Sequence, residues 1–176
     1  PADKKASRRR LGIPEDRFCV GTVSRLVPQK ALRDLIVALA PHRKVDLIVV
    51  GEGPQRQELE SLAKHVGLEV YFLGARQDVP QILPAFDVFC LSSRWEGQPI
   101  ALLEAMACAL PCVVTGTEGV REVVTASGCG FLVPIGEPSL LGQAIVKLMN
   151  NTSEGIRQGR QARVWAETQH TTRRSE

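Results

Sequence analysis

Six short apolar runs recur along this chain, and amphipathic stretches of helical period separate them. The runs are almost continuously apolar, which is typical of strands buried on both faces of a sheet. They span residues 18–24, 45–51, 70–74, 88–92, 112–115 and 130–133. Strict alternation of strand and helix predicts a parallel sheet with right-handed crossovers and helices on both faces.

The intervening helices are expected over residues 31–40, 54–66, 79–85, 99–109, 120–126 and 138–150. The chain of 176 residues is long enough for one full core. We therefore interpret residues 17–150 as one doubly wound, Rossmann-like α/β domain. Residues 1–16 are expected to form a basic linker and lead-in. Residues 151–176 are expected to hold a helix near 156–168 and a disordered tail from His170, and Trp165 either packs on a partner domain or belongs to a frayed amphipathic end.

The net charge of +3 resides in the two ends of the chain, since five basic and one acidic side chain lie among residues 1–10. A net acidic body argues against nucleic acid as a partner. No apolar run approaches the roughly 20 residues of a membrane-spanning helix, and the basic start lacks the apolar segment of a signal peptide. The missing initiator Met suggests that the chain begins inside a longer protein.

The five cysteines form no CxxC pair, and no histidine stands at metal-ligand spacing. Reduced thiols in a cytoplasmic protein are the expectation, with no metal site. Disulfides or a metal centre remain the less favoured alternative.

Ligands of an open parallel sheet bind beyond the carboxyl ends of its strands. Polar residues and glycines follow the expected strand ends as Ser24, Arg25 and Lys30, then 51–53, then Gly74 and Arg76, then 92–99, then 115–119. Arg25 and Lys30 could neutralise a diphosphate, or they could be solvated surface charges.

The loop 92–99 is the most informative, because it runs into a helix expected to begin at Pro99. Free N–H groups and the positive dipole end make such a helix start an anion site, and Gly97 allows close approach of a ligand. Glu96 lies before the helix, and Glu104 lies about one and a half turns along it. These carboxylates could accept hydrogen bonds from vicinal hydroxyls. Alternatively, Glu96 caps the helix and Glu104 is solvated.

Motifs of other nucleotide and hydrolase sites are absent from the sequence. The stretch 51–54 begins like a dinucleotide fingerprint but lacks the third glycine and follows the second strand. There is no GxxxxGK[ST] loop and no GxSxG elbow. These absences disfavour NAD-binding, P-loop and serine-hydrolase functions.

The stretch 96–107, EGQPIALLEAMA, resembles the EGxPxxxLEAMA signature of glycosyltransferase family 4. Further family motifs follow in order at 21–26 with Gln29 and Lys30, and at 49–54, 72–74, 111–115, 119–124 and 130–134, so the resemblance covers about residues 11–168. Ala31, Ala109 and Glu118 stand where the family usually has Gly, and 98–100 is a variant of the common FG loop.

The resemblance implies the donor-binding, C-terminal half of a GT-B fold, whose partner would be an N-terminal acceptor-binding domain. It implies a retaining glycosyltransferase that uses a nucleotide-sugar, with no metal and no cofactor. Catalysis would rest on Arg25, Lys30 and Glu96. Peripheral membrane association of the full-length enzyme is compatible with it. A standalone nucleotide-sugar-binding module and a GT-B-like sugar-nucleotide epimerase are the alternatives.

The resemblance also assigns roles within the nucleotide-sugar site. Arg25 and Lys30 would hold the diphosphate, Glu96 the donor sugar and Glu104 the ribose. The loop 74–77 would lie near the base. The full set of implied donor-binding residues is Ser24, Arg25, Lys30, Gly53, Gly74, Arg76, Glu96, Gly97, Gln98, Pro99, Ile100 and Glu104.

Overall fold

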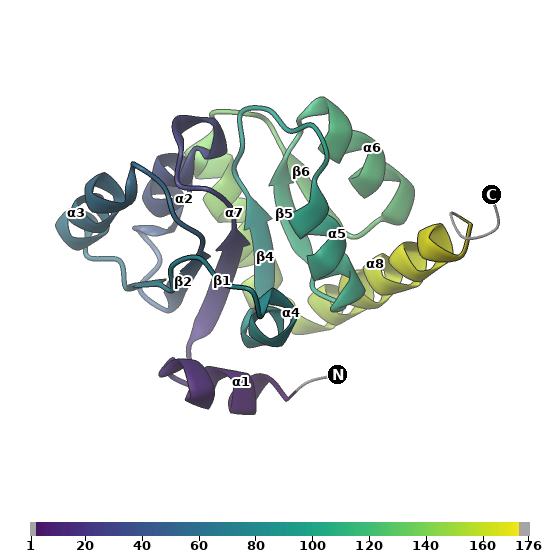
Figure 1. Ribbon diagram of the computed structural model, residues 1–176, viewed down its shortest axis with the longest axis horizontal. Helices are drawn as coiled ribbons and strands as arrows, with labels where there is room; N and C mark the ends of the chain where they lie inside the picture. Colours follow the sequence, from purple (N-terminus) through teal and green to yellow (C-terminus); the bar gives the residue numbers. More distant parts are fainter. Residues whose placement is uncertain (1–2, 173–176) are drawn as a thin grey trace.

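The computed structural model describes residues 3–172 of the chain and contains a six-stranded, all-parallel sheet (Figure 1). Its strand order is β3-β2-β1-β4-β5-β6, so the order reverses between β1 and β4. The strands are β1 (Phe18–Val23), β2 (Val45–Val50), β3 (Val70–Phe72), β4 (Val88–Leu91), β5 (Cys112–Thr115) and β6 (Gly130–Val133). This confirms the predicted doubly wound sheet and puts the switch point, where such folds bind ligands, beside β1 and β4.

The first four strands end one or two residues before their predicted ends. Gly51 (φ 136°) and Gly74 (φ 72°) have left-handed backbone that cannot continue a strand. The apolar pattern therefore marked the strands well, while glycine geometry decided where β2 and β3 turn into loops.

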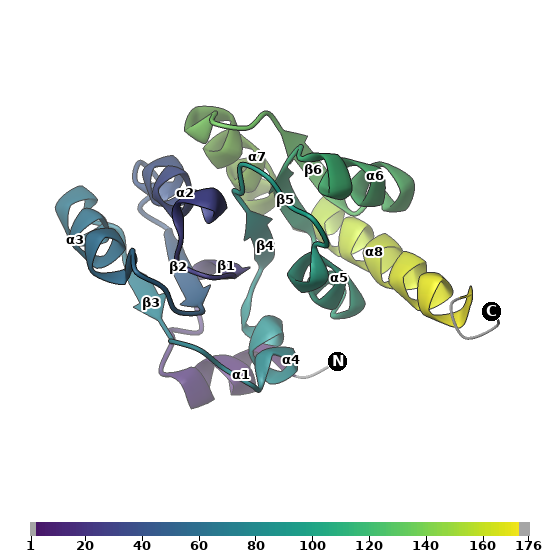
Figure 2. The ribbon, with the colours of Figure 1, turned by 45° about the horizontal axis from the view of Figure 1, so that its top comes forward.

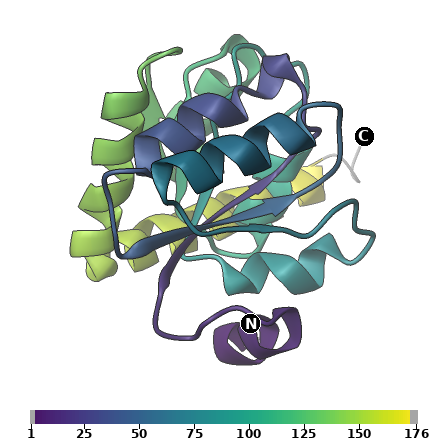
Figure 3. The same ribbon diagram turned by 90° about the vertical axis from the view of Figure 1, so that its left-hand side faces the viewer.

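Helices cover both faces of the sheet (Figure 2), and the sheet separates the core into two clusters. On one face lie α2 (Leu32–Leu39), α3 (Arg56–Val66) and α7 (Pro138–Asn150), and Figure 3 shows α2 and α3 lying across that face. The other face carries α4 (Val79–Ile82) with the 3-10 turn η2 (Leu83–Ala85), α5 (Ile100–Ala107), α6 (Glu118–Ser127) and α8 (Thr152–Thr172). A further 3-10 turn, η1 (Pro28–Lys30), precedes α2. Because the strands are buried between both layers, neither side of the sheet shows a polar alternation.

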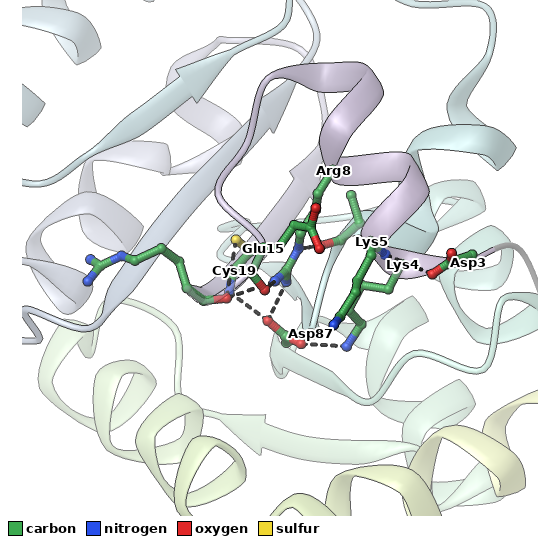
Figure 4. A network of polar contacts seen from close by, with 9 residues as sticks. Asp3, Lys4, Lys5, Arg8, Glu15, Cys19 and Asp87 are labelled. Carbon is green, nitrogen blue, oxygen red and sulfur yellow. Dashed lines mark hydrogen bonds and ion pairs between the residues drawn. The ribbon is translucent and has the colours of Figure 1, made fainter.

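The stretch 1–16, expected to be a linker, contains helix α1 (Lys4–Leu11), so that expectation is wrong there. Arg8 anchors the helix with only 2% of its surface exposed. Its guanidinium donates to the carbonyls of Ala85, Glu15 and Arg17 and, at 2.6 Å, to the Asp87 carboxylate (Figure 4). A fully bonded Arg can be buried, so a residue that reads as basic tail belongs to the core.

Helix α8 is longer than the predicted 156–168, and it packs on the same domain. Gly159 allows this, since a Cβ there would lie 2.0 Å from the Ala109 carbonyl oxygen. Trp165 is half-buried against the core of this domain, so the expectation of a frayed end is wrong, whereas a contact with a partner domain stays a prediction. The helical backbone continues through Thr172, against the predicted tail from His170, and residues 173–176 lie outside the described part.

Candidate functional site

The loops that follow β1, β2, β4 and β5 meet at the sheet edge toward which the strand arrows point in Figure 1. Parallel strands bring their carboxyl ends to one edge, so residues far apart in sequence become neighbours there. Side chains from η1 and from the loop between β4 and α5 form the best-connected part of this edge.

Lys30 and Glu96 form an ion pair at the centre of the site. The Lys30 ammonium donates to both carboxylate oxygens, at 2.7 Å to Oε1 and 2.9 Å to Oε2. The two side chains are 18% and 7% exposed. The Ser93 hydroxyl donates to the same Oε1. The solvated-charge alternative is therefore wrong for Lys30, and the helix-cap alternative is wrong for Glu96, because its carboxylate bonds side chains and α5 has no side-chain cap.

Three more hydrogen bonds tie η1 to the loop after β4. The Ser92 hydroxyl donates to the Lys30 carbonyl at 2.9 Å, and the Arg94 N–H donates to the Gln29 carbonyl at 2.8 Å. The Gln29 amide donates to the Trp95 carbonyl at 3.1 Å. These bonds fix the backbone on either side of the ion pair, so the Lys30–Glu96 geometry is held before any ligand arrives.

The turn after β2 packs tightly against the turn after β1, and its glycines permit the contact. A Cβ at Gly51 would lie 1.9 Å from the Ser24 carbonyl oxygen, and one at Gly53 would lie 2.4 Å from the Leu26 carbonyl oxygen. Gly51 also donates its N–H to the Gly74 carbonyl at 2.8 Å. Ser24 is thus enclosed, and its buried hydroxyl finds no hydrogen-bond partner among the described residues.

The first turn of α5 faces the same edge with free donors. Pro99 is the N-cap and supplies no side-chain cap. Gln98 accepts the Ile100 N–H at 2.9 Å, whereas the N–H groups of Ala101 and Leu102 have no backbone acceptor in the described part of the chain. An unoccupied helix start of this kind attracts an anion. It lies directly after Glu96 and Gly97, as the sequence predicted.

The start of α6 closes the site on its other side. A Cβ at Gly119 would lie 2.6 Å from the Gly97 carbonyl oxygen, so the two loops are in contact there. The hydroxyl of Thr117, the N-cap of α6, is buried without a partner among residues 3–172. Two orphaned hydroxyls, Ser24 and Thr117, therefore lie on loops of this one edge, where a bound ligand would give such groups partners.

Other predicted residues are not drawn into this cluster. Arg25 is exposed and forms no ion pair with a described residue, so the structure does not decide between its two predicted roles. Arg76 is exposed and pairs through Nε and Nη2 with Asp78, at 2.8 Å each. That hydrogen-bonded pair lowers the pKa of Asp78 to about 2.

Glu104 is half-buried on α5 and has no side-chain bond to any described residue. Ile100 is 60% exposed.

Sequence reasoning noted Gln29 only as part of a motif, and it gave no role to Ser93 or Thr115, although both lie in loops that it marked. Ser93 holds Glu96, and Thr115 on β5 donates its hydroxyl to the Ser93 carbonyl. Their signal was only a polar residue at or just after the end of a buried strand, which is too common to single out one serine.

Among the described residues no group of three or more His, Cys, Asp or Glu is placed to hold a metal ion. Likewise, none of their helices is both long and apolar enough to cross a bilayer.

The switch point of this doubly wound parallel sheet thus brings together an open helix start, the Lys30 ammonium and the Glu96 carboxylate. The family model for group 1 glycosyl transferases matches residues 3–165. The chain therefore belongs to the group 1 glycosyl transferases.

Individual relatives agree with this assignment. The chain is 30% identical to the N-acetyl-alpha-D-glucosaminyl L-malate synthase of Bacillus anthracis over 92% of its own length and 44% of the relative. It is 31% identical to a GDP-mannose-dependent phosphatidylinositol monomannoside mannosyltransferase of Corynebacterium glutamicum, over 96% and 48%. The Anabaena protein Alr3699/HepE, solved in complex with UDP and glucose, superposes with a TM-score of 0.88 and 33% identity, over 96% and 48%. The chain thus spans about half the length of the relatives it matches.

Proposed function

We propose that this domain binds the nucleotide-sugar donor of a glycosyltransferase of family 4, in which it forms the C-terminal half of a GT-B fold. The observation that carries the proposal is the partly buried Lys30–Glu96 pair beside the open start of α5. The cation, the free N–H groups and the carboxylate lie within one loop system, which supports a role for them in holding a diphosphate and a sugar. An N-terminal acceptor-binding domain would supply the facing wall, and the chain's coverage of only about half of each relative supports this.

The reaction transfers the sugar from the diphosphate to an acceptor hydroxyl. The acceptor oxygen forms a bond to the anomeric carbon as the bond from that carbon to the phosphate oxygen breaks. The electron pair of the broken bond stays on the phosphate, and the proton of the acceptor hydroxyl passes to the departing phosphate oxygen. Lys30, Arg25 and the first-turn N–H groups of α5 stabilise this charge, which is electrostatic catalysis. These donors are fixed before reaction, so little reorganisation is needed in the transition state.

Retention of anomeric configuration and independence from a metal ion are part of the proposal. The cationic side chains at the diphosphate offer the charge that a metal ion would otherwise supply. We place the reaction in the cytoplasm, which the free thiols of all five cysteines, each within the described part, support. Peripheral membrane association of the whole enzyme is supported by the lipid acceptor in the name of the Corynebacterium relative.

Titration calorimetry of the 176-residue chain tests the proposal. We expect binding of at least one of UDP, GDP and ADP, and no sugar transfer to an added acceptor, because the site has one wall. Absence of binding to all three diphosphates would reject the donor-site assignment. Robust transfer by the chain alone would reject the need for a second domain.

The two glutamates separate the subsites within that assay. Glu104→Ala should weaken binding of the diphosphate and of the intact nucleotide-sugar alike, because both carry the ribose. Glu96→Ala should weaken the intact donor more than the diphosphate, because only the donor carries the sugar. Equal losses for both ligands in Glu96→Ala would refute its contact with the sugar.

A further inference from the structure

Ser93 lies between β4 and α5 with 1% of its surface exposed, and its hydroxyl donates to Oε1 of Glu96. The same oxygen accepts the Lys30 ammonium at 2.7 Å. Glu96 Oε1 is therefore held by one charged and one neutral donor. No other acceptor for the Ser93 hydroxyl occurs among residues 3–172.

Two central strands hold this serine in place. Ser93 follows the end of β4 by two residues, and its carbonyl accepts the hydroxyl of Thr115 on the neighbouring strand β5. Thr115 is itself buried, at 4% exposure. A hydrogen-bonded path thus runs from the sheet through Ser93 to the Glu96 carboxylate, and it contains no charged group before Glu96.

The hydrogen bonds of Lys30, the other partner of Glu96, differ from that of Ser93 because a ligand can compete for them. Its ammonium has three donors, and it makes two contacts with Glu96. A diphosphate entering beside it competes for those donors, since phosphate oxygens are strong acceptors of charged hydrogen bonds. Glu96, 7% exposed, would then lose part of its compensation, and a buried carboxylate without donors is costly.

We propose that Ser93 is a positioning residue for donor binding: it keeps the Glu96 carboxylate bonded and oriented toward the sugar when Lys30 turns to the diphosphate. This rests on the proposed function. A neutral hydroxyl is suited to the task, because it has no charge for the diphosphate to draw away. With Ser93 bonded to Glu96, Lys30 can bind the diphosphate while Glu96 binds the sugar.

Calorimetry of the chain with matched ligands tests this role. The probes are UDP, GDP and ADP, each against UDP-glucose, GDP-mannose and ADP-glucose. A hydrogen bond to a charged group corresponds to roughly 10- to 100-fold in affinity. We expect Ser93→Ala to weaken the intact donor by about tenfold or more and the bare diphosphate by less than about twofold. Ser93→Cys, which keeps a weak donor, should fall between.

Controls distinguish positioning from general support of the fold. Ser127→Ala removes another buried hydroxyl, at the far end of α6, and should lower the melting temperature without separating the two ligands. In a Glu96→Ala background, Ser93→Ala should add no further loss, because its acceptor is gone. Equal losses for donor and diphosphate, or a full additional loss in that background, would overturn the role of Ser93. A parent chain that binds no diphosphate would instead remove the proposed function, and this inference with it.

Discussion

The Lys30 ammonium and both oxygens of the Glu96 carboxylate meet at 2.7 and 2.9 Å, across 66 residues of sequence. The pair neutralises two charges that the sequence assigned to different parts of one ligand. It therefore stabilises this arrangement of the two loops, and we expect a bound ligand to replace part of these contacts. The five hydrogen bonds between η1 and the loop after β4, counting the two of the pair itself, hold both residues in place.

Removing only one member of the pair should cost stability as well as binding. Lys30→Ala leaves the Glu96 carboxylate buried with Ser93 as its remaining donor, which should lower the free energy of unfolding by about 1–3 kcal/mol. The double variant Lys30→Ala/Glu96→Ala should recover part of that stability but not diphosphate binding. Urea denaturation measures the first effect and calorimetry the second. Strictly additive stability losses would show that the two charges do not interact.

Substitution of Arg25 distinguishes its two predicted roles, that of a diphosphate ligand and that of a solvated surface charge. As a ligand, Arg25→Ala should weaken binding of UDP or GDP about tenfold, and added salt should weaken the parent more than the variant. Arg33→Ala is the matched control, because Arg33 is a comparably exposed arginine whose partner is Glu58 on α3. Unchanged affinity in Arg25→Ala would assign that side chain to the solvated surface.

Arg8 should matter to the fold far more than its place in a basic N-terminal stretch suggests. Arg8→Ala leaves three carbonyls without their Arg8 donor and leaves Asp87 with only Lys4 and the Cys19 N–H as donors. It should lower the free energy of unfolding by about 3–5 kcal/mol. Arg9→Ala, which breaks an exposed pair with Glu15, should cost less than about 1 kcal/mol. Chemical denaturation compares the two. Similar small losses would mean that α1 contributes little to the stability of the domain.

Ala109 has a left-handed backbone, with φ at 59°, at a position where the family usually has Gly. The left-handed conformation costs an L-residue about 1–2 kcal/mol of folding free energy. Gly instead costs about 0.5–1 kcal/mol, because it loses more conformational entropy on folding. Ala109→Gly should therefore raise the melting temperature by about 2–4 °C at most. Ala107→Gly, within helix α5, should lower it. A loss in Ala109→Gly would show that its methyl group contributes packing that outweighs the strain.

Buried thiols should make the protein labile at alkaline pH. Burial raises the pKa of Cys19 to about 11 and raises that of Cys90 well above its ordinary range. Unfolded thiols lose protons from about pH 8.5, so between that pH and the folded pKa the folded state binds more protons and stability falls as pH rises. Each thiol contributes up to about 1.4 kcal/mol per pH unit. Thermal melting from pH 7 to 10.5 measures the slope, and Cys90→Ala should make it shallower. A slope unchanged in that variant would exclude this thiol as the cause.

The sequence alone determined the six strands, the helices that follow them and the fold class. Near-continuous apolar runs between amphipathic stretches predicted all six strands and a helix after each of them, because burial on both faces removes polar alternation. Strand ends then located the site, since parallel strands share one carboxyl edge. These inferences depend on local periodicity and spacing, which a sequence displays directly.

Only the tertiary structure decided which side chains meet. The pairing of Lys30 with Glu96 and the support of Ser93 depend on β1 lying beside β4, a contact between segments distant in the chain. Burial of Arg8 depends on carbonyls of Ala85, Glu15 and Arg17 converging on one guanidinium, and the docking of α8 depends on Gly159 meeting the Ala109 carbonyl. Local sequence patterns predict that the groups in these bonds are surface charges or loop residues. The bonds contribute to stability only once the folded chain brings the partners together and removes water, so a local pattern does not reveal them.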